Sequence, residues 1–368
     1  MARGAQLSIN PDAMVHNLRV ARAYAGSARI VAPVKADAYG HGLLLAAAAL
    51  RGADAFAVAC LEEALPLREA GYAHPILLLE GVFDGTELLP VCRYRLDIVV
   101  HADWQIRLLE LERLPRPVNV WIKIDTGMHR LGFAPGQVAD AFHRLSRCRN
   151  VASHIRFMTH FACADNRADA MTLRQLATFD AATADLDGEH SLANSAALLG
   201  WPQTHRQWVR PGIMLYGASP FVDQRDAPRL RPAMTLSSRL IAIRQVGAGE
   251  AVGYGHTWVA SESSTVGTVA LGYGDGYPRH APSGTPVLVN GVRTQLIGRV
   301  SMDMLTVDLE PLDGRVEVGD EVVLWGGGLP AEEVARHVGT IAYELYCGVG
   351  ARVPRVIMPT PSTSAPGG

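Results

Sequence analysis

Positively charged and hydroxyl-bearing side chains stand directly after a series of short apolar runs in the first 215 residues. Lys35 ends the run ARIVAPVK, His160 ends HIRFMTH, and Arg210 lies inside WVRPG. Further residues in the same situation are Lys123, Asp125, Arg130, Asn194 and Ser195. Each of them alone has an ordinary explanation, such as a solvated lysine, a salt-bridged arginine or a helix cap. Gathered in one place, two lysines, two arginines and a histidine would instead bind an anionic ligand.

The apolar runs that carry these residues alternate with amphipathic segments from residue 28 to about 215. Eight runs predict β-strands: ARIVAPVK, DAFAVA, PILLLE, LDIVV, VNVWIKID, HIRFMTH, HSLAN and WVRPG. Between most of them lie helical patterns such as LEEALPLREAG, and Asn10-Pro11 predicts the start of the opening helix. Such alternation indicates a parallel sheet, and a count of eight favours a closed (β/α)8 barrel. Because a barrel gathers the carboxyl ends of its strands at one mouth, we expect the polar residues to share a site there.

The pattern changes after about residue 230. The runs MTLSSRLIAIRQV, STVGTVALGY, TPVLVNGV, RVSMDMLTVDL and DEVVLW are β-rich, with no long helical segment between them. Asn290-Gly291 between two apolar runs predicts a β-hairpin. We therefore expect a barrel over residues 9–230 and a mostly β-strand domain over 231–360, joined by an N-terminal strand at 4–9. The final residues, 361–368, are rich in Pro, Ser and Gly and are predicted to be disordered.

Length and composition exclude several classes of function. A chain of 368 residues with 48% hydrophobic residues is long enough for two domains, and its net charge of −2 argues against a nucleic-acid partner. The five cysteines are scattered and indicate neither a metal site nor a disulfide framework. The run GLLLAAAAL is too short to cross a membrane, and MARGAQLSINPDAM lacks the apolar core of a signal peptide. We expect a cytoplasmic protein without bound metal or membrane partner.

Nine motifs occur in the order found in one known family. They are VKADAYGHG, WIKIDTGMHRLG, THFACAD, LANSAAL, WVRPGIMLYG, VGYGHTW, GYGDGYPR, GRVSMDM and AYEL, and together they span nearly the whole chain. In these motifs the sequence resembles the bacterial alanine racemases, which use pyridoxal 5′-phosphate (PLP). The resemblance implies the family's fold, a TIM-type barrel that binds PLP followed by a β domain. It also implies that the chain is an isomerase.

The resemblance assigns cofactor roles to residues at the barrel mouth. It implies that Lys35 carries PLP as a Schiff base, since an amine is needed to form an exchangeable imine. Further implied cofactor contacts are Tyr39, Arg130, His160, Asn194, Ser195, Arg210, Gly212, Ile213 and Tyr343. Arg210 would face the pyridine nitrogen and keep it unprotonated, because arginine cannot accept a proton at working pH. A short-lived carbanion then favours racemisation over side reactions, and His160 would help fix Arg210.

Racemisation needs an acid/base group on each face of the α-carbon. The resemblance implies an external aldimine with Lys35 on one face and Tyr254 on the other. Without it, Gly253-Tyr254-Gly255 would be interpreted as a strand bulge. Substrate contacts are implied for Arg130, Met302 and Tyr254, and Asp303 is a plausible structural partner. In the family Tyr254 and Met302 come from the other subunit, which implies a head-to-tail homodimer with shared active sites.

Four further positions belong to the resemblance. Tyr273 and Arg279 resemble residues that line a narrow entrance favouring alanine. Lys123 matches a position that carries a carbamate in some members, which would hold Arg130. His129 stands where a glycine is common.

Other functions remain open at this point. A racemase of different or broader substrate choice, acting on serine or lysine, would share these motifs. A PLP carrier protein of the same barrel type generally lacks the β domain. A PLP decarboxylase of this type would place an acidic residue where Arg210 stands. The implied role is the interconversion of L- and D-alanine, either supplying D-alanine for the peptidoglycan of the cell wall or acting in alanine catabolism.

Overall fold

The computed structural model describes residues 3–221 and 229–358, so the predicted disordered tail at 361–368 lies outside the described residues. The chain divides into two compact units. One comprises Val15–Leu215 with Ser219–Leu230, and the other comprises Met1–Met14, Tyr216–Ala218 and Arg231–Gly368. Each unit is described by itself. Among the described residues, no helix is both long and apolar enough to span a bilayer.

The first unit is a closed barrel of parallel strands, which confirms the predicted fold class. Its strands are β2 (Arg29–Pro33), β3 (Ala55–Val58), β4 (Ile76–Leu78), β5 (Asp97–Val100), β6 (Val120–Lys123), β7 (Arg156–Met158), β8 (Glu189–Ser191) and β9 (Trp208–Val209). Most of their residues are buried, as expected for strands covered on both faces, and β9 closes the ring by pairing with β2. The interior is filled by side chains from alternate positions, including Val31, Leu77, Val99, Trp121 and Trp208.

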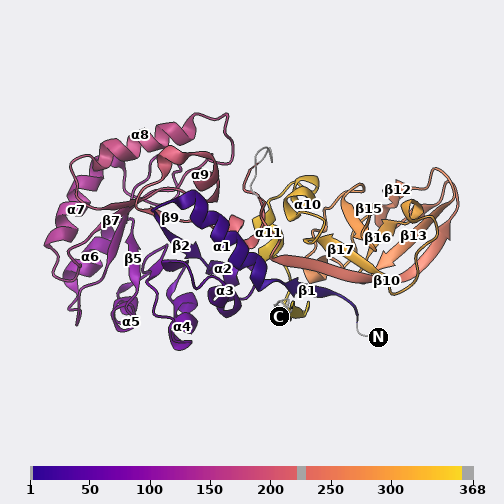
Figure 1. Cartoon of the computed structure of the whole chain (residues 1–368), viewed down its shortest axis with the longest axis horizontal. Helices are drawn as coiled ribbons and strands as arrows, with labels where there is room; N and C mark the ends of the chain where they lie inside the picture. Colours follow the sequence, from indigo (N-terminus) through magenta and orange to yellow (C-terminus); the bar gives the residue numbers. More distant parts are fainter. Residues whose placement is uncertain (1–2, 222–228, 359–368) are drawn as a thin grey trace, which may run out of the picture. The chain divides into compact units, whose positions relative to one another are not determined.

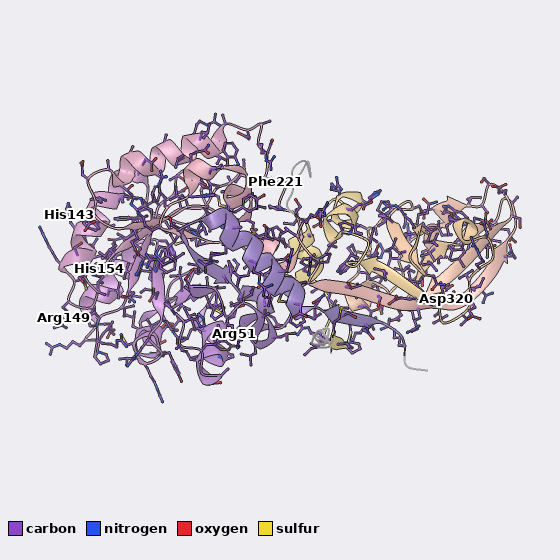
Figure 2. All side chains as sticks on the ribbon, viewed as in Figure 1. Arg51, His143, Arg149, His154, Phe221 and Asp320 are labelled. Carbon is purple, nitrogen blue, oxygen red and sulfur yellow. The ribbon has the colours of Figure 1, made fainter. Side chains whose placement is uncertain are left out.

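Helices surround this barrel (Figure 1). They are α1 (Pro11–Ala25), α3 (Leu43–Ala49), α4 (Leu61–Glu69), α5 (Leu88–Arg93), α6 (Asp103–Leu111), α7 (Val138–Arg147), α8 (Met171–Thr183) and α9 (Ser195–Gly200), with a short turn α2 (Lys35–Tyr39). Asn10 accepts a hydrogen bond from the Ala13 N–H at 3.1 Å, so the predicted start of α1 is confirmed. Exposed side chains such as His143, Arg149 and His154 lie on the outer surface of this unit (Figure 2).

The second unit is mostly β-strand. Its larger sheet contains β1 (Gln6–Ile9), β10 (Met234–Val246), β13 (Ser264–Val269), β14 (Pro286–Val289), β15 (Val292–Ile297), β16 (Leu305–Asp308), β17 (Glu321–Trp325) and β18 (Arg355–Ile357). A two-stranded sheet of β11 (Ala251–Val252) and β12 (Trp258–Val259) and the helices α10 (Ala331–Val338) and α11 (Ala342–Cys347) complete it. The hairpin predicted at Asn290-Gly291 is confirmed between β14 and β15, where both residues have positive φ.

The amino ends of the barrel strands carry a network of charges. Glu189 accepts hydrogen bonds from Arg156 Nε and Trp208 Nε1, both at 2.9 Å, and forms an ion pair with Arg29. The guanidinium of Arg29 lies 4.1 Å from the centre of the Trp208 ring. Since this network lies at the end of the barrel opposite the carboxyl ends of the strands, we interpret it as structural.

Replacing Glu189 by glutamine is expected to flatten the acid dependence of stability. Burial raises the pKa of Glu189, but hydrogen bonds from Trp208, Arg156 and Arg29 outweigh it and lower the pKa from 4.5 to about 2. A lowered carboxyl pKa stabilises the fold above pH 4.5, and that contribution is lost as the pH falls towards 2. Because the carboxylate is partly exposed, we expect a loss of about 1 kcal/mol in Glu189→Gln at neutral pH. Thermal unfolding measured from pH 7 to pH 2 tests this. If the melting temperatures of the variant and the wild type fell equally as the pH was lowered, the prediction would be contradicted.

Candidate active site at the barrel mouth

The structure places the candidate residues of the first unit at the carboxyl ends of the barrel strands. Lys35 follows β2, Lys123 is the last residue of β6, and Arg210 directly follows β9. His160 lies two residues beyond β7, and Ser195 opens α9 after β8. These residues are far apart in the sequence, and closure of the barrel brings their strands to one mouth.

The turn after Lys35 has an unusual backbone. Ala36, Asp37, Ala38 and Tyr39 all have φ between 51° and 54°, so four successive non-glycine residues are left-handed. Such residues cost about 1–2 kcal/mol each, so the surrounding contacts must offset several kcal/mol. Asp37 contributes, because its Oδ1 accepts the Leu43 N–H at 2.7 Å. The turn fixes Lys35 and Tyr39 at its two ends. The sequence indicated only a glycine-bounded loop here.

Tyr39, Gly212 and Ser195 line a small polar cradle. The buried Ser195 Oγ accepts the Gly212 N–H at 2.8 Å and the Met214 N–H at 3.3 Å. A Cβ added at Gly212 would lie 2.7 Å from Tyr39 Oη, so any larger residue would fill the space beside the tyrosine hydroxyl. Hydroxyl groups and backbone N–H groups of this kind suit a phosphate.

Two neighbours complete the segments that form this cradle. Ile213 is buried and opens the 3-10 turn η4 (Ile213–Tyr216). Asn194 accepts the Ala197 N–H at 3.0 Å and so caps α9. In the structure the Asn194 side chain therefore acts as a helix cap.

Four cationic groups lie close together at the mouth. Burial first, and then the positive charges of Arg130, Arg210 and Lys35, lower the pKa of Lys123 from 10.5 to about 8, while Glu80 acts in the opposite direction. Lys123 is only 8% exposed, and keeping it protonated in the fold costs about 3 kcal/mol. Positive potential of this kind attracts anions such as phosphate and carboxylate.

Arg210 is held rigidly at the centre of this cluster. Its Nη1 donates to Ser191 O and Ser191 Oγ, both at 2.7 Å, and its Nη2 donates to Thr159 O at 2.6 Å. Burial lowers the pKa of Arg210 to about 10, which leaves it charged at neutral pH. Burial, followed by the charge of Arg210, lowers the pKa of His160 well below 6.5, so the imidazole is neutral. Arg210 therefore donates these three hydrogen bonds to Ser191 and Thr159, and the role that the resemblance implies for His160 stays a prediction.

Asp125 shapes the loop that precedes Arg130. Its Oδ1 accepts the N–H groups of Gly127 and His129, both at 3.0 Å, and its Oδ2 lies 3.1 Å from His129 Nδ1. His129 has φ of 54°, in the left-handed region that favours glycine. A glycine at this position would adopt the same backbone conformation without strain. In this chain the hydrogen bonds to Asp125 stabilise the left-handed His129. Arg130 itself is exposed.

The remaining candidates belong to the second unit. Tyr254 is 68% exposed and begins the 3-10 turn η5 (Tyr254–His256) between β11 and β12. A strand bulge, the interpretation favoured without the family resemblance, is therefore wrong. Tyr343 is half-buried in α11, and Arg279 is exposed.

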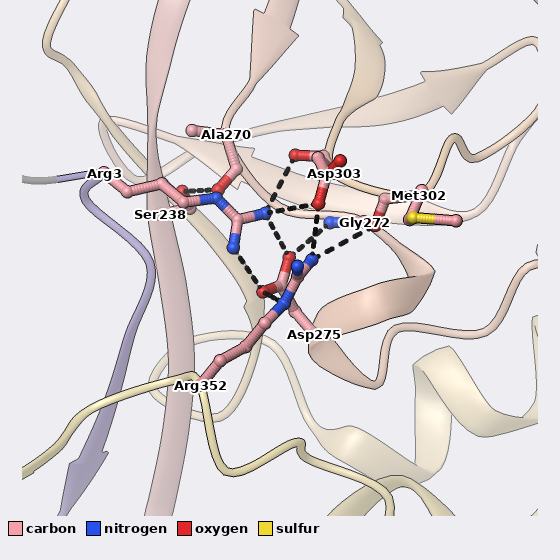
Figure 3. Close-up of polar contacts among 8 residues, drawn as sticks. All are labelled: Arg3, Ser238, Ala270, Gly272, Asp275, Met302, Asp303 and Arg352. Atoms are coloured by element: carbon pink, nitrogen blue, oxygen red, sulfur yellow. Dashed lines mark hydrogen bonds and ion pairs between the residues drawn. The ribbon is translucent and has the colours of Figure 1, made fainter.

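A cluster of ion pairs that joins Arg3 and Arg352 to Asp275 and Asp303 lies next to Met302 (Figure 3). The turn that carries Tyr273 bonds to the loop that carries Met302, through Gly274 N–H to Met302 O at 2.8 Å. Asp275 is fully buried beneath this junction and pairs with Arg3 at 2.6 Å and with Arg352 Nε at 2.7 Å. Arg352 also binds Asp303 Oδ1 at 2.7 Å. Asp303 is thus a structural partner of the Met302 loop.

Sequence reasoning missed several residues that hold the candidate groups. They are Glu63, Thr159, Ser191, Asp275, Arg3 and Arg352. Most of them act on backbone atoms or on residues distant in the sequence, so their spacing gives no motif. Among them, only Asp275 stood in a visible pattern, the glycine-rich stretch GYGDGYPR.

Known proteins match both units of the chain. Residues 9–220 match the family described as alanine racemase, N-terminal domain, and residues 233–357 match alanine racemase, C-terminal domain. A curated alanine racemase from Halorhodospira halophila is 55% identical over 96% of this chain and 98% of its own length. One from Vibrio cholerae is 51% identical over 95% of this chain and 97% of its own length.

Solved structures are also similar. The biosynthetic alanine racemase from Pseudomonas aeruginosa has a TM-score of 0.93 and 47% identity, covering 96% of this chain and 99% of that one. The alanine racemase from Acinetobacter baumannii has a TM-score of 0.90 and 36% identity, over 96% of this chain and 99% of that one.

Proposed function

The chain belongs to the alanine racemase family and is an amino-acid racemase, and we propose that it interconverts L- and D-alanine. In this proposal PLP binds at the barrel mouth, and Lys35 and Tyr254 act as the two bases. The observation that carries the proposal is the placement of Lys35 at one end of a left-handed turn whose other end, Tyr39, lies beside Gly212, which donates its N–H to Ser195. That arrangement offers an amine for an aldehyde and a separate cradle for a phosphate.

The residues present fit PLP. Lys35 would hold its aldehyde, and the phosphate would lie among Tyr39, Ser195, Gly212 and Ile213, with Asn194 and Tyr343 as further contacts. The space that a Cβ at Gly212 would fill supports this fit. When bound, PLP supplies an electron sink that acidifies the α-proton of the amino acid.

Arg210 and its surroundings would set the strength of that sink. Its terminal nitrogens donate to Ser191 and Thr159, so the remaining Nε–H would be the group available to the ring nitrogen of the cofactor. A charged guanidinium there opposes protonation of the ring nitrogen and weakens electron withdrawal. His160, neutral and half-buried near Arg210, would cover the ring without adding charge.

Lys35 and Tyr254 would move the protons. Lys35 Nζ takes or returns the α-proton on one face of the substrate, and Tyr254 Oη does so on the other. Arg130 and the Met302 N–H would bind the substrate carboxylate, and Tyr273 with Arg279 would line the entrance.

We propose that Lys123 carries a carbamate. Burial and the neighbouring cations lower its pKa to about 8, which favours the neutral amine, and only a neutral amine adds to CO2. The product is an anion, formed with release of one proton, that would relieve the crowding of positive charge and hold Arg130. We expect a carbamate 13C resonance after exposure to 13C-bicarbonate, absent in Lys123→Gln, together with a roughly tenfold loss of activity in that variant. High-resolution density for a bare amine would contradict this.

Tyr254, Met302, Tyr273 and Arg279 would come from the second subunit of a head-to-tail homodimer, so that each active site is shared. The enzyme would act in the cytoplasm, where D-alanine is made for peptidoglycan or consumed in alanine catabolism.

Incubation of the purified enzyme with L-alanine, L-serine and L-lysine separately tests the proposal. Chiral chromatography should reveal D-alanine formation, faster than the other two racemisations, by a yellow protein that borohydride labels at Lys35. A yellow protein that forms no D-alanine would overturn the assignment of alanine as the substrate, but it would not contradict PLP as the cofactor. Colourless protein with no label at Lys35 would overturn both.

A further inference from the structure

Glu63 binds the backbone next to Lys35. This half-buried residue of α4 uses both carboxylate oxygens: Oε1 accepts the Ala36 N–H at 2.6 Å, and Oε2 accepts the Ala59 N–H at 2.8 Å. Ala36 is the first residue of the left-handed turn and is joined to Lys35 by the peptide bond whose N–H Glu63 holds. A hydrogen bond to a charged acceptor is about twice as strong as one between neutral groups.

The carboxylate stands where the pairing of two barrel strands ends. Val34 N–H donates to Ala57 O at 2.8 Å and extends the pairing of β2 with β3. If this parallel ladder continued, the Ala59 N–H would donate to Val34 O and the Ala36 N–H to Ala59 O. The left-handed turn carries Ala36 out of that register, and Glu63 receives the N–H groups of both residues instead. The side chain therefore substitutes for the ladder at the point where β2 must give way to the turn.

We propose that Glu63 is a positioning residue that sets the place of the Lys35 amine relative to the phosphate cradle at Tyr39. The inference rests on the proposed role of Lys35. Both hydrogen bonds described for Glu63 come from backbone N–H groups, so it acts through the peptide between Lys35 and Ala36. Loss of this restraint would let the left-handed turn relax, moving Lys35 and Tyr39 apart.

The test compares Glu63→Gln with Glu62→Gln, its exposed neighbour on α4. Glutamine keeps the length of the side chain but has one acceptor oxygen, so one of the two N–H groups loses its partner. At saturating PLP we expect kcat for L-alanine to fall about 10- to 100-fold in Glu63→Gln, with the KM within threefold of wild type. Absorbance titration of the apoenzyme should show PLP affinity weakened about tenfold. Glu62→Gln should match wild type in all three.

Several results decide the question. A Glu63→Gln enzyme with wild-type kcat at saturating PLP would overturn the proposal even if it melts at a lower temperature, because that would mean a purely structural role. A raised KM with unchanged kcat would overturn it as well. If Glu63→Gln does not fold, Glu63→Asp is measured, since a side chain shorter by one methylene cannot span both N–H groups, and full kcat there would count against positioning. Failure of the proposed function looks different: the wild-type enzyme itself would then neither bind PLP nor racemise alanine.

Discussion

Mixing a Lys35→Ala enzyme with a Tyr254→Phe enzyme is expected to restore about a quarter of the wild-type activity, although each alone loses at least about 10³-fold. Each variant lacks the acid/base group on one face of the α-carbon, so neither homodimer can complete the proton exchange. If each site takes Lys35 from one subunit and Tyr254 from the other, every hybrid dimer contains one intact site and one doubly defective site. Half of the dimers in an equilibrated equal mixture are hybrids.

A reverse mixture provides the matched control. Wild-type enzyme is combined with the Lys35→Ala, Tyr254→Phe double variant, and differently tagged subunits report that exchange has occurred. Shared sites predict that activity falls by about half on exchange, because neither site of the hybrid dimer is intact. Sites built within one subunit predict no fall, and no recovery in the first mixture. That pair of results would end the shared-site proposal.

The barrel could be predicted because its signals are local. Each strand is a short apolar run, and the polar residue that ends it, such as Lys35 or Arg210, is visible where the run stops. Closure then follows from the strand count, which the structure confirms. The hairpin at Asn290-Gly291 was equally local, because those two residue types accept the positive φ that the turn needs.

The supports of the candidate site could not be predicted in the same way. The left-handed backbone of Ala36–Tyr39 has no glycine within it, and its stability comes from contacts such as that of Glu63, which lies 27 residues from Ala36. The fixing of Arg210 by carbonyl groups depends on how three strands align at the mouth. Asp275 looked like part of a glycine-rich turn, and only the fold brings Arg3 to it from 272 residues away. Long-range contacts to backbone atoms leave no spacing pattern in a single sequence.

Changing Arg210 to glutamate is expected to convert part of the racemase activity into transamination. Arg210 is charged and buried, with its terminal nitrogens bound to Ser191 and Thr159, so a positive charge is fixed where the ring nitrogen is proposed to lie. A carboxylate at this position would favour a protonated ring nitrogen and prolong the life of the deprotonated substrate. A longer lifetime lets the proton return at the wrong carbon. We expect D-alanine formation to fall by about 10²-fold or more, and pyruvate to appear.

Arg210→Gln separates loss of the cation from gain of an acid. Its neutral amide supplies neither the positive charge nor a carboxylate, so racemisation should fall without pyruvate formation. Chiral chromatography measures the first activity and a coupled lactate dehydrogenase assay measures the second, with thermal unfolding as a check that both variants fold. Equal pyruvate formation in the two variants would show that the acid is not the cause. If Arg210→Gln racemised alanine at the wild-type rate, the guanidinium would have no role in the mechanism. The proton transfers are proposed to depend on the protonation state of the ring nitrogen, so loss of the group that sets this state must slow them.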